Sequence, residues 1–237
     1  MKVKVNSVTG FEDAFASMFM SKRTWTPELD KEIRAICHHV YWYGLDEGVV
    51  ATEKFNKWLD MLCNMTKKHI TVGKFIQISI MTEGLHRAGQ DDVDSHAERF
   101  DNRIIRSSTR LATFDQDEFS DYYKDKVITT DKALKILGVD IPETIEVGGN
   151  LYTKCPNGYV KYEYKDDKDV LRGLYMLGIP SNFVSQISLS QFAHVYKERG
   201  IHGGANPEVK EWAESVAGQL EDLYPQLNRG LLMSIEN

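Results

Sequence analysis

Apolar residues recur at helical spacing over several long stretches of the chain, namely residues 11–20, 27–43, 52–65 and 207–223. In the second stretch, Ile33, Ile36 and Val40 fall on one face of a helix. Its start is marked by Thr26, whose hydroxyl can cap the helix, and by a proline at the first helical position. The spacing therefore predicts amphipathic helices that each bury one face.

Alternating apolar and polar positions predict strands elsewhere in the chain. Residues 2–8 alternate in this way, and residues 75–80 do so most clearly, with Gly84 expected to end that strand. Residues 151–164 predict a hairpin, because the dipeptide Asn157-Gly158 supplies the positive φ angles that a tight turn requires. We expect these strands to contribute to one main sheet.

Shorter periodic stretches predict further helices, at residues 85–100, 130–138, 169–177 and 188–198. No internal repeat, low-complexity tract or obvious linker separates the predicted elements. The mixture of helices and strands predicts a single helix-rich α+β domain, residues 1–237, around one mainly antiparallel sheet.

Composition narrows the class of protein. The hydrophobic fraction of 42% and the charged fraction of 27% are those of an ordinary globular chain. No apolar run approaches the ~20 residues that span a bilayer, and the first residues lack the apolar core of a signal peptide. We therefore expect a cytoplasmic protein with no membrane partner. The net charge of −6 argues against binding to nucleic acid.

Several common catalytic and binding motifs are missing from the sequence. Cys37, Cys63 and Cys155 are widely spaced, which argues against both a disulfide framework and a zinc site. No histidine pair has the HxxxH or HExxH spacing of a metal site. There is no GxSxG, P-loop or GxGxxG sequence, so serine hydrolase, P-loop and Rossmann functions are not expected.

Two groups of residues have the chemistry to hold an anion beside a planar ring. Ser108 and Arg110 place a hydroxyl and a guanidinium two residues apart, which suits a phosphate or a pyrimidine, although a solvated basic loop has the same composition. Arg199 ends a predicted helix, a position that favours a cation even without a function. A basic cluster, Arg99, Arg103, Arg106 and Arg110, lies within twelve positions of the otherwise acidic chain.

Taken together, the order of these segments resembles the flavin-dependent thymidylate synthases. That family has a His-x-Ser segment before a strand, then Gly-[Ile/Val]-Ser-Arg-Ala, a Ser-x-Arg, and near the C-terminus a helix ending in arginine and an Ala-Gln-x-Glu-Ile. The matching segments here are residues 69–71, 84–88, 108–110, 189–199 and 205–209. The resemblance covers most of the chain except a divergent insert at about residues 115–170, and it implies a thymidylate synthase-complementing-protein-like fold.

The resemblance also implies an activity. Members of the family are homotetramers that bind FAD and methylate dUMP to dTMP, with methylenetetrahydrofolate as carbon donor and NADPH as reductant. A hydride from the reduced flavin replaces the cysteine nucleophile of the classical enzyme. By analogy, Arg199 and Ser108 are the expected catalytic residues. The expected substrate-binding residues are Ser107, Ser108, Arg110, Arg172 and Arg199, and the expected cofactor-binding residues are His69, Arg87, Arg99, Arg103 and His194.

The sequence departs from the family pattern mainly on the flavin side. The Arg-His-Arg segment that grips the FAD phosphates is replaced by residues 95–101, and Phe75 stands in place of a functional histidine. Two other functions therefore remain open at this stage. One is a flavin-dependent pyrimidine-nucleotide hydroxymethylase, and the other is a non-catalytic nucleotide-binding homologue that has lost FAD.

Overall fold

The computed structural model describes residues 1–96, 103–106, 119–155, 157–171, 174, 177–201 and 205–235, with only the backbone described at 96, 103–104 and 168–169. The chain divides into two compact units. The insert-bearing unit contains residues 1–2, 82–91 and 105–183, and the helical unit contains residues 3–81, 92–104 and 184–237. All four strands of the larger sheet contain a boundary between the units, so the units are not consecutive domains. The single domain of residues 1–237 stays a prediction.

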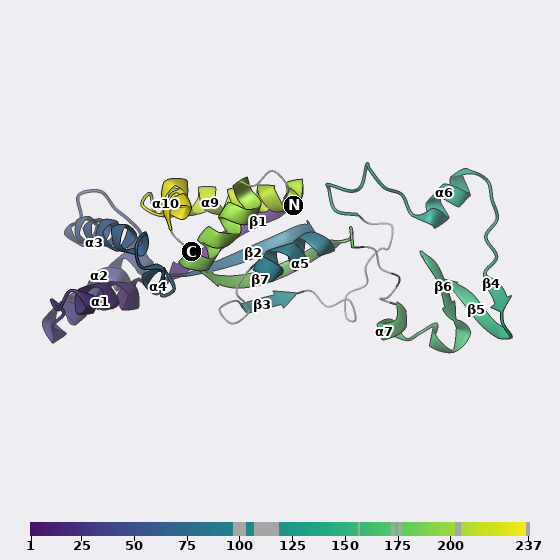
Figure 1. Cartoon of the computed structure of the whole chain (residues 1–237), viewed down its shortest axis with the longest axis horizontal. Helices are drawn as coiled ribbons and strands as arrows, with labels where there is room; N and C mark the ends of the chain where they lie inside the picture. The colour runs from purple at the N-terminus through teal and green to yellow at the C-terminus, as the bar shows by residue number, and fades with distance from the viewer. Residues whose placement is uncertain are drawn as a thin grey trace. The chain divides into compact units, whose positions relative to one another are not determined.

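Four strands form the larger sheet, in the order β1-β2-β7-β3. Their bounds are β1 (Lys2–Thr9), β2 (Gln77–His86), β7 (Pro180–Ser188) and β3 (Arg103–Arg106). Along β7, side chains alternate between buried and more exposed positions, as expected for a strand with one covered face. Helix α5 (Arg87–His96) follows β2 directly (Figure 1).

The helical unit contains two groups of helices (Figure 1). The first group is α1 (Phe11–Ser21), α2 (Pro27–Tyr43), α3 (Val50–Thr66) and α4 (Ile70–Gly73), whose members pack on one another. The second group is α8 (Leu189–Val195), the π-helix η3 (Tyr196–Ile201), α9 (Pro207–Leu223) and α10 (Arg229–Ser234). Thr26 caps α2 as predicted, because its hydroxyl accepts a hydrogen bond from the Leu29 N–H at 3.2 Å.

Aromatic side chains form the core of the first helical group. Phe15 lies edge-on to Phe55 with ring centroids 5.4 Å apart, and Trp58 packs against Phe15 at 5.8 Å. In the second group, Phe192 of α8 meets Trp212 of α9 at 6.2 Å, and both side chains are fully buried. Burying such large rings supplies much of the hydrophobic stabilisation of each group.

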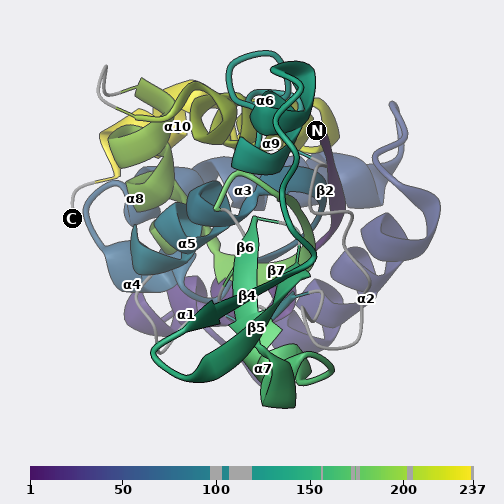
Figure 2. The ribbon, with the colours of Figure 1, turned by 90° about the vertical axis from the view of Figure 1, so that its right-hand side faces the viewer.

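The insert-bearing unit holds a second, smaller sheet of three antiparallel strands, β4 (Thr144–Val147), β5 (Asn150–Cys155) and β6 (Gly158–Lys161). These strands lie side by side in both views (Figures 1 and 2). Helix α6 (Thr130–Ile136), the short 3-10 turn η1 (Tyr162–Tyr164) and α7 (Lys168–Leu171) complete the unit. The β5–β6 turn contains Asn157 at a φ of 69°, which confirms the predicted hairpin.

The predicted α+β class is confirmed. The hairpin strands, which were expected to contribute to one main sheet, form a second sheet with β4 instead, and several predicted bounds need correction. The strand predicted to end at Gly84 continues to His86, because Gly84 takes a φ of 82° and its N–H donates to the side chain of Asn182. The helix predicted from Leu85 therefore begins at Arg87. Strand β7, helix α10 and the second sheet's strand β4 were not predicted. The helix predicted at residues 169–177 is described only as α7.

Candidate active site

Many of the predicted site residues lie outside the described part of the chain, namely Arg99, Ser107, Ser108, Arg110 and Arg172. Arg103 lies in β3, where only its backbone is described. The roles assigned to these residues therefore stay predictions. Arg199, His69 and His194 lie in the helical unit and Arg87 lies in the insert-bearing unit, so each is described within its own unit.

The Arg199 guanidinium forms an ion pair with Asp92, with Nη2 and Oδ1 2.8 Å apart. Both side chains belong to the helical unit and are partly buried, 22% and 31% exposed. A charged hydrogen bond in such a setting is stronger than one at a fully exposed surface. The pair therefore holds the guanidinium in one orientation, as a group that recognises a planar ligand must be held.

The chain around Arg199 is a π-helix, η3, rather than the regular α-helix that the sequence predicted to continue to Glu198. The ring of Tyr196 is buried at its start, and the Tyr196 hydroxyl donates to Glu214 of α9 at 3.1 Å. π-Helical turns are rare and occur frequently at functional sites. This segment therefore presents Arg199 from backbone that is anchored on α9.

Asp92 was not among the predicted site residues. Its partner lies 107 positions away in the sequence, so the pairing is not visible in any local motif. The available sequence signal was the acidic pair Asp91-Asp92 on the helix predicted at residues 85–100. The structure separates the roles of the pair, because Asp91 contacts Arg106 at 2.7 Å while Asp92 contacts Arg199.

Helices α4 and α8 bring the segments that carry His69 and His194 together. The Ser190 hydroxyl of α8 donates to the Ile70 carbonyl of α4 at 2.6 Å. Gly73 permits this close approach, because a Cβ there would lie 2.4 Å from Ser190 Oγ and 2.8 Å from Thr66 Cγ2. His69 immediately precedes α4, and His194 lies in the last turn of α8.

Replacing Gly73 by alanine is expected to destabilise the fold by about 1–3 kcal/mol, because the added methyl group overpacks the contact between α4 and α8. Chemical denaturation measures the effect. The double variant Gly73→Ala/Ser190→Ala removes the nearest clashing atom and should recover part of the loss. A Gly73→Ala variant as stable as the parent chain would contradict the close approach.

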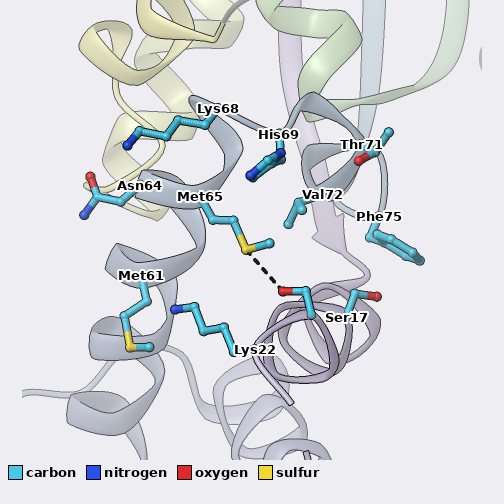
Figure 3. A pocket seen from close by; sticks show the side chains of 11 residues that line it. Ser17, Lys22, Met61, Asn64, Met65, Lys68, His69, Thr71, Val72 and Phe75 are labelled. Atoms are coloured by element: carbon cyan, nitrogen blue, oxygen red, sulfur yellow. Dashed lines mark hydrogen bonds between the residues drawn. The ribbon is translucent and has the colours of Figure 1, made fainter. Parts of the chain in front are cut away.

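A cavity of about 740 Å³ opens beside His69 (Figure 3). Its walls come from α1, α3 and the segment of residues 69–75. The lining residues are Ser17, Ser21, Lys22, Met61, Asn64, Met65, Lys68, His69, Thr71, Val72 and Phe75. None of them is acidic, although the whole chain carries a net charge of −6. The cavity therefore combines basic groups with an apolar wall.

Arg87 belongs to the insert-bearing unit and stands at the first position of α5. Its backbone N–H donates to the Ile179 carbonyl at 3.0 Å, which ties the start of the helix to the segment before β7. The neighbouring His86 is buried, and its ring meets the ring of Tyr123 edge-on at 5.0 Å. His86 was not among the predicted site residues. Its buried ring fixes the end of β2 by packing against Tyr123.

The cysteines are poor candidates for a nucleophile. Burial raises the pKa of the Cys63 thiol to about 12, and the thiol donates a weak hydrogen bond to the Gln226 carbonyl at 3.7 Å. Burial also raises the pKa of the Cys37 thiol. It raises the pKa of the Cys155 thiol as well, although Cys155 is only partly buried. A nucleophilic cysteine needs a depressed pKa, so these thiols are structural.

The buried thiols predict a loss of stability at alkaline pH. The folded-state pKa of Cys63 lies above the ordinary value of 9.0, so the neutral thiol stabilises the fold below pH 9 and this contribution is lost as the pH rises toward 12. The free energy of unfolding should fall by up to about 1.4 kcal/mol per pH unit for this group. Urea unfolding at pH 8, 9 and 10 measures the slope. The slope should flatten more in Cys63→Ala than in Cys155→Ala, because Cys63 is the more deeply buried thiol, whereas equal slopes in all three proteins would contradict the assignment.

Within the part of the chain that the structure describes, no cluster of His, Cys, Asp and Glu side chains could hold a metal ion. No helix there is long and apolar enough to cross a membrane.

The amino-acid sequence matches no protein-family model and no curated protein. Solved structures do match. The chain is similar to thymidylate synthase X (ThyX) from Helicobacter pylori, solved with FAD and dUMP, at a TM-score of 0.58 and 12% identity, over 98% of this chain and 100% of that one. A second structure of the flavin-dependent ThyX of that organism, complexed with FAD and dUMP, matches at a TM-score of 0.51 and 12% identity, over 97% and 100%. The chain therefore has the fold of these enzymes.

Proposed function

We propose that the chain is a flavin-dependent thymidylate synthase that converts dUMP to dTMP. The observation that carries the proposal is the fold, which is similar over 98% of this chain to that of an enzyme solved with FAD and dUMP. The order of the sequence motifs supports the same assignment independently. The three raised thiol pKa values agree with a reaction that uses no cysteine nucleophile.

The residues beside His69 suit a planar anionic cofactor such as FAD. The cavity there has basic groups, no acidic lining residue and an aromatic side chain, Phe75, that is 44% exposed at its edge. When bound, reduced FAD would supply the hydride that activates the uracil ring in place of a cysteine nucleophile, with NADPH restoring the reduced flavin. His69 and His194 are the residues that we expect to contact it.

Side chains of this chain would bind the nucleotide and stabilise the charge that develops on its ring. Arg199, held by Asp92, would donate hydrogen bonds to a carbonyl oxygen of the uracil ring, where negative charge develops as C5 becomes nucleophilic. Ser108 and Arg110 would hold the sugar and phosphate of the nucleotide. The carbon unit of methylenetetrahydrofolate would then bond to C5 as one of its C–N bonds opens. Loss of the C5 proton to solvent, with cleavage of the second C–N bond, would release tetrahydrofolate, and the hydride taken up by the ring would end in the methyl group.

The visible absorption spectrum of the purified chain tests the proposal, recorded before and after incubation with FAD and removal of the excess. Retained flavin bands, followed by conversion of dUMP to a product one methyl group heavier, would support it. A product heavier by one further oxygen would identify a hydroxymethylase instead. A colourless protein that binds dUMP without turnover would identify a nucleotide-binding homologue.

A further inference from the structure

A cavity of about 250 Å³ opens among β1, the helices α1, α2 and α3, and Tyr224 at the end of α9. All its described lining residues belong to the helical unit, and none of them lines the cavity beside His69. They are Val8, Thr9, Phe11, Glu12, Cys37, Val40, Tyr41, Phe55 and Tyr224. This cavity is therefore separate from the one that suits FAD.

Five of the lining residues are buried, and we call them the floor of the cavity. Their side chains are at most 5% exposed, namely those of Val8, Phe11, Cys37, Val40 and Phe55. Burial raises the pKa of the Cys37 thiol, so this group stays neutral and acts as a small apolar side chain. The floor therefore favours the apolar part of a ligand, because contact with it removes apolar surface from water.

The other four lining residues, Thr9, Glu12, Tyr41 and Tyr224, are more exposed, and we call them the mouth of the cavity. Tyr41 is the most accessible large side chain among them, at 62% exposed. Glu12 is the one charged residue among the described lining residues. The mouth therefore combines a negative charge with two aromatic rings.

The Glu12 carboxylate forms no ion pair within the described part of the chain. Asp30 is the main cause of the raised pKa of Arg34 and binds its guanidinium at 2.9 Å, whereas Glu12 contributes least to that rise. A cation bound at the mouth would therefore meet a carboxylate that no described side chain already neutralises.

The charge of Glu12 acts on both parts of the cavity. Burial raises the pKa of Tyr224 to about 12, and Cys37 and the Glu12 carboxylate add to this rise. Burial is also the main cause of the raised pKa of Cys37, and Glu12 adds to it. The carboxylate is therefore close enough to the mouth ring and to the floor thiol to attract a positive charge into the cavity.

The aromatic rings favour an organic cation. The Phe11 ring lies 5.0 Å from the rings of both Phe55 and Tyr224, measured between centroids, so these rings form one cluster. Aromatic faces attract ammonium groups that come within about 6 Å, most strongly where water is excluded. A bare metal ion suits the cavity poorly, because calcium and magnesium take about six oxygen ligands and the floor has none from side chains.

The volume limits the size of the ligand. At about 250 Å³, the cavity is smaller than the roughly 300–1,000 Å³ of ordinary ligand pockets, so it suits a body no larger than a single ring. We propose that this cavity binds a small organic ammonium ion, with its apolar body on the floor and its nitrogen at the mouth beside Glu12 and Tyr41. Such binding does not depend on the proposed methylation of dUMP.

The same residues also have a structural role that needs no ligand. Glu12 lies in the first turn of α1, where a carboxylate stabilises the helix dipole, and the rings contribute to the core. Asp13 lies in the same turn and does not line the cavity, so it offers a matched control. A purely structural role predicts altered melting temperatures in the variants and no binding of ammonium compounds.

An NMR titration of the full-length chain, labelled at its valine methyl groups, tests the proposal. The methyl groups of Val8 and Val40 report on the floor. The probes are phenethylammonium, the neutral phenethyl alcohol and the anionic phenylacetate, which share one ring and differ in charge. The variants are Glu12→Gln and Tyr41→Leu, with Asp13→Asn as the control, and the melting temperature of each confirms that it is folded.

We expect phenethylammonium to shift the floor methyl signals saturably, and to bind the parent chain and Asp13→Asn equally well. Glu12→Gln should bind it about tenfold more weakly, because a charge-assisted hydrogen bond is lost. Tyr41→Leu should weaken binding by about two- to fivefold, as expected for one exposed ring beside a cation. Phenethyl alcohol should bind about tenfold more weakly than the ammonium compound, and phenylacetate should not bind.

Four results would overturn the proposal. Phenethylammonium produces no saturable shift, or it binds no better than phenethyl alcohol, which would leave an apolar pocket without selectivity for charge. Asp13→Asn loses as much affinity as Glu12→Gln, which would indicate a general effect of net charge. The floor signals shift with chain concentration in the absence of a probe, which would show that a second copy fills the cavity. Because no turnover is measured, failure here leaves the proposed methylation untouched.

Discussion

Replacing Arg199 by alanine is expected to lower kcat/KM for the proposed methylation of dUMP by about 100- to 1,000-fold. The reason is that a fixed guanidinium stabilises charge that develops on the pyrimidine only in the transition state, and removing one such donor typically costs this much. The assay is dTMP formation at saturating carbon donor and reductant. Arg199→Lys keeps the charge and loses the planar fork, so we expect it to recover only a small part of the activity.

The Arg199→Ala variant should keep its fold and its flavin. The lost ion pair is partly exposed, so stability should change by about 1 kcal/mol and the melting temperature by roughly 2–4 °C. The flavin absorption spectrum should match that of the parent chain. A variant that retains flavin and turns over dUMP within threefold of the parent chain would remove Arg199 from the catalytic site.

Replacing Asp92 by alanine is expected to lower kcat by about 10- to 100-fold, while KM for dUMP changes much less. Asp92 acts here as a positioning residue, because its carboxylate holds the Arg199 guanidinium at 2.8 Å, and small displacements of a catalytic group can cost this much in rate. Asp92→Asn keeps a hydrogen-bond acceptor of nearly the same shape, so it should recover most of the lost rate. Steady-state kinetics on both variants measure the split between kcat and KM.

A double-mutant cycle distinguishes this coupling from a general structural effect. In the Arg199→Ala background, Asp92→Ala should cost little further activity, because the group that it orients is already missing. Independent, additive losses in the double variant would show that Asp92 acts by another route. Failure of Asp92→Asn to recover activity would point to the charge of the carboxylate rather than to its geometry.

The structure also changes how the divergent positions of the chain are understood. Phe75 stands where the related family has a functional histidine, and it forms the exposed aromatic edge of the cavity that His69 borders. Neither Lys22 nor Lys68 belongs to any motif of the family, yet both line that cavity. The cavity beside His69 is therefore lined in part by residues that the family's motifs do not include.

Local patterns were sufficient for the helices that bury one regular face. Helix α9 has the bounds predicted for it, residues 207–223, because its apolar period is regular and Asn206 with Pro207 marks its start. The helix cap at Thr26 and the hairpin turn at Asn157 were also predicted correctly, because each depends on residues within a few positions of it. The α+β class follows from such elements.

Strand β7 shows where local patterns fail. Its covered face includes buried serines, Ser181 and Ser185, so the apolar alternation that marks a strand is interrupted. Ser181 is tolerated there because its hydroxyl donates to Gln90 at 2.6 Å, a partner far away in the sequence. Most buried polar groups have such a partner, and for Ser181 only the fold supplies it.

The sequence by itself determined the long amphipathic helices, the hairpin, the fold class and the resemblance that singled out Arg199, because these depend on spacing and residue type along the chain. Only the tertiary structure decided that Asp92 orients Arg199, that α4 meets α8 through Gly73 and Ser190, and that two lysines share a cavity with Phe75. The physical reason is the same in each case. These contacts join residues that no local periodicity relates, and their energies depend on distance in space.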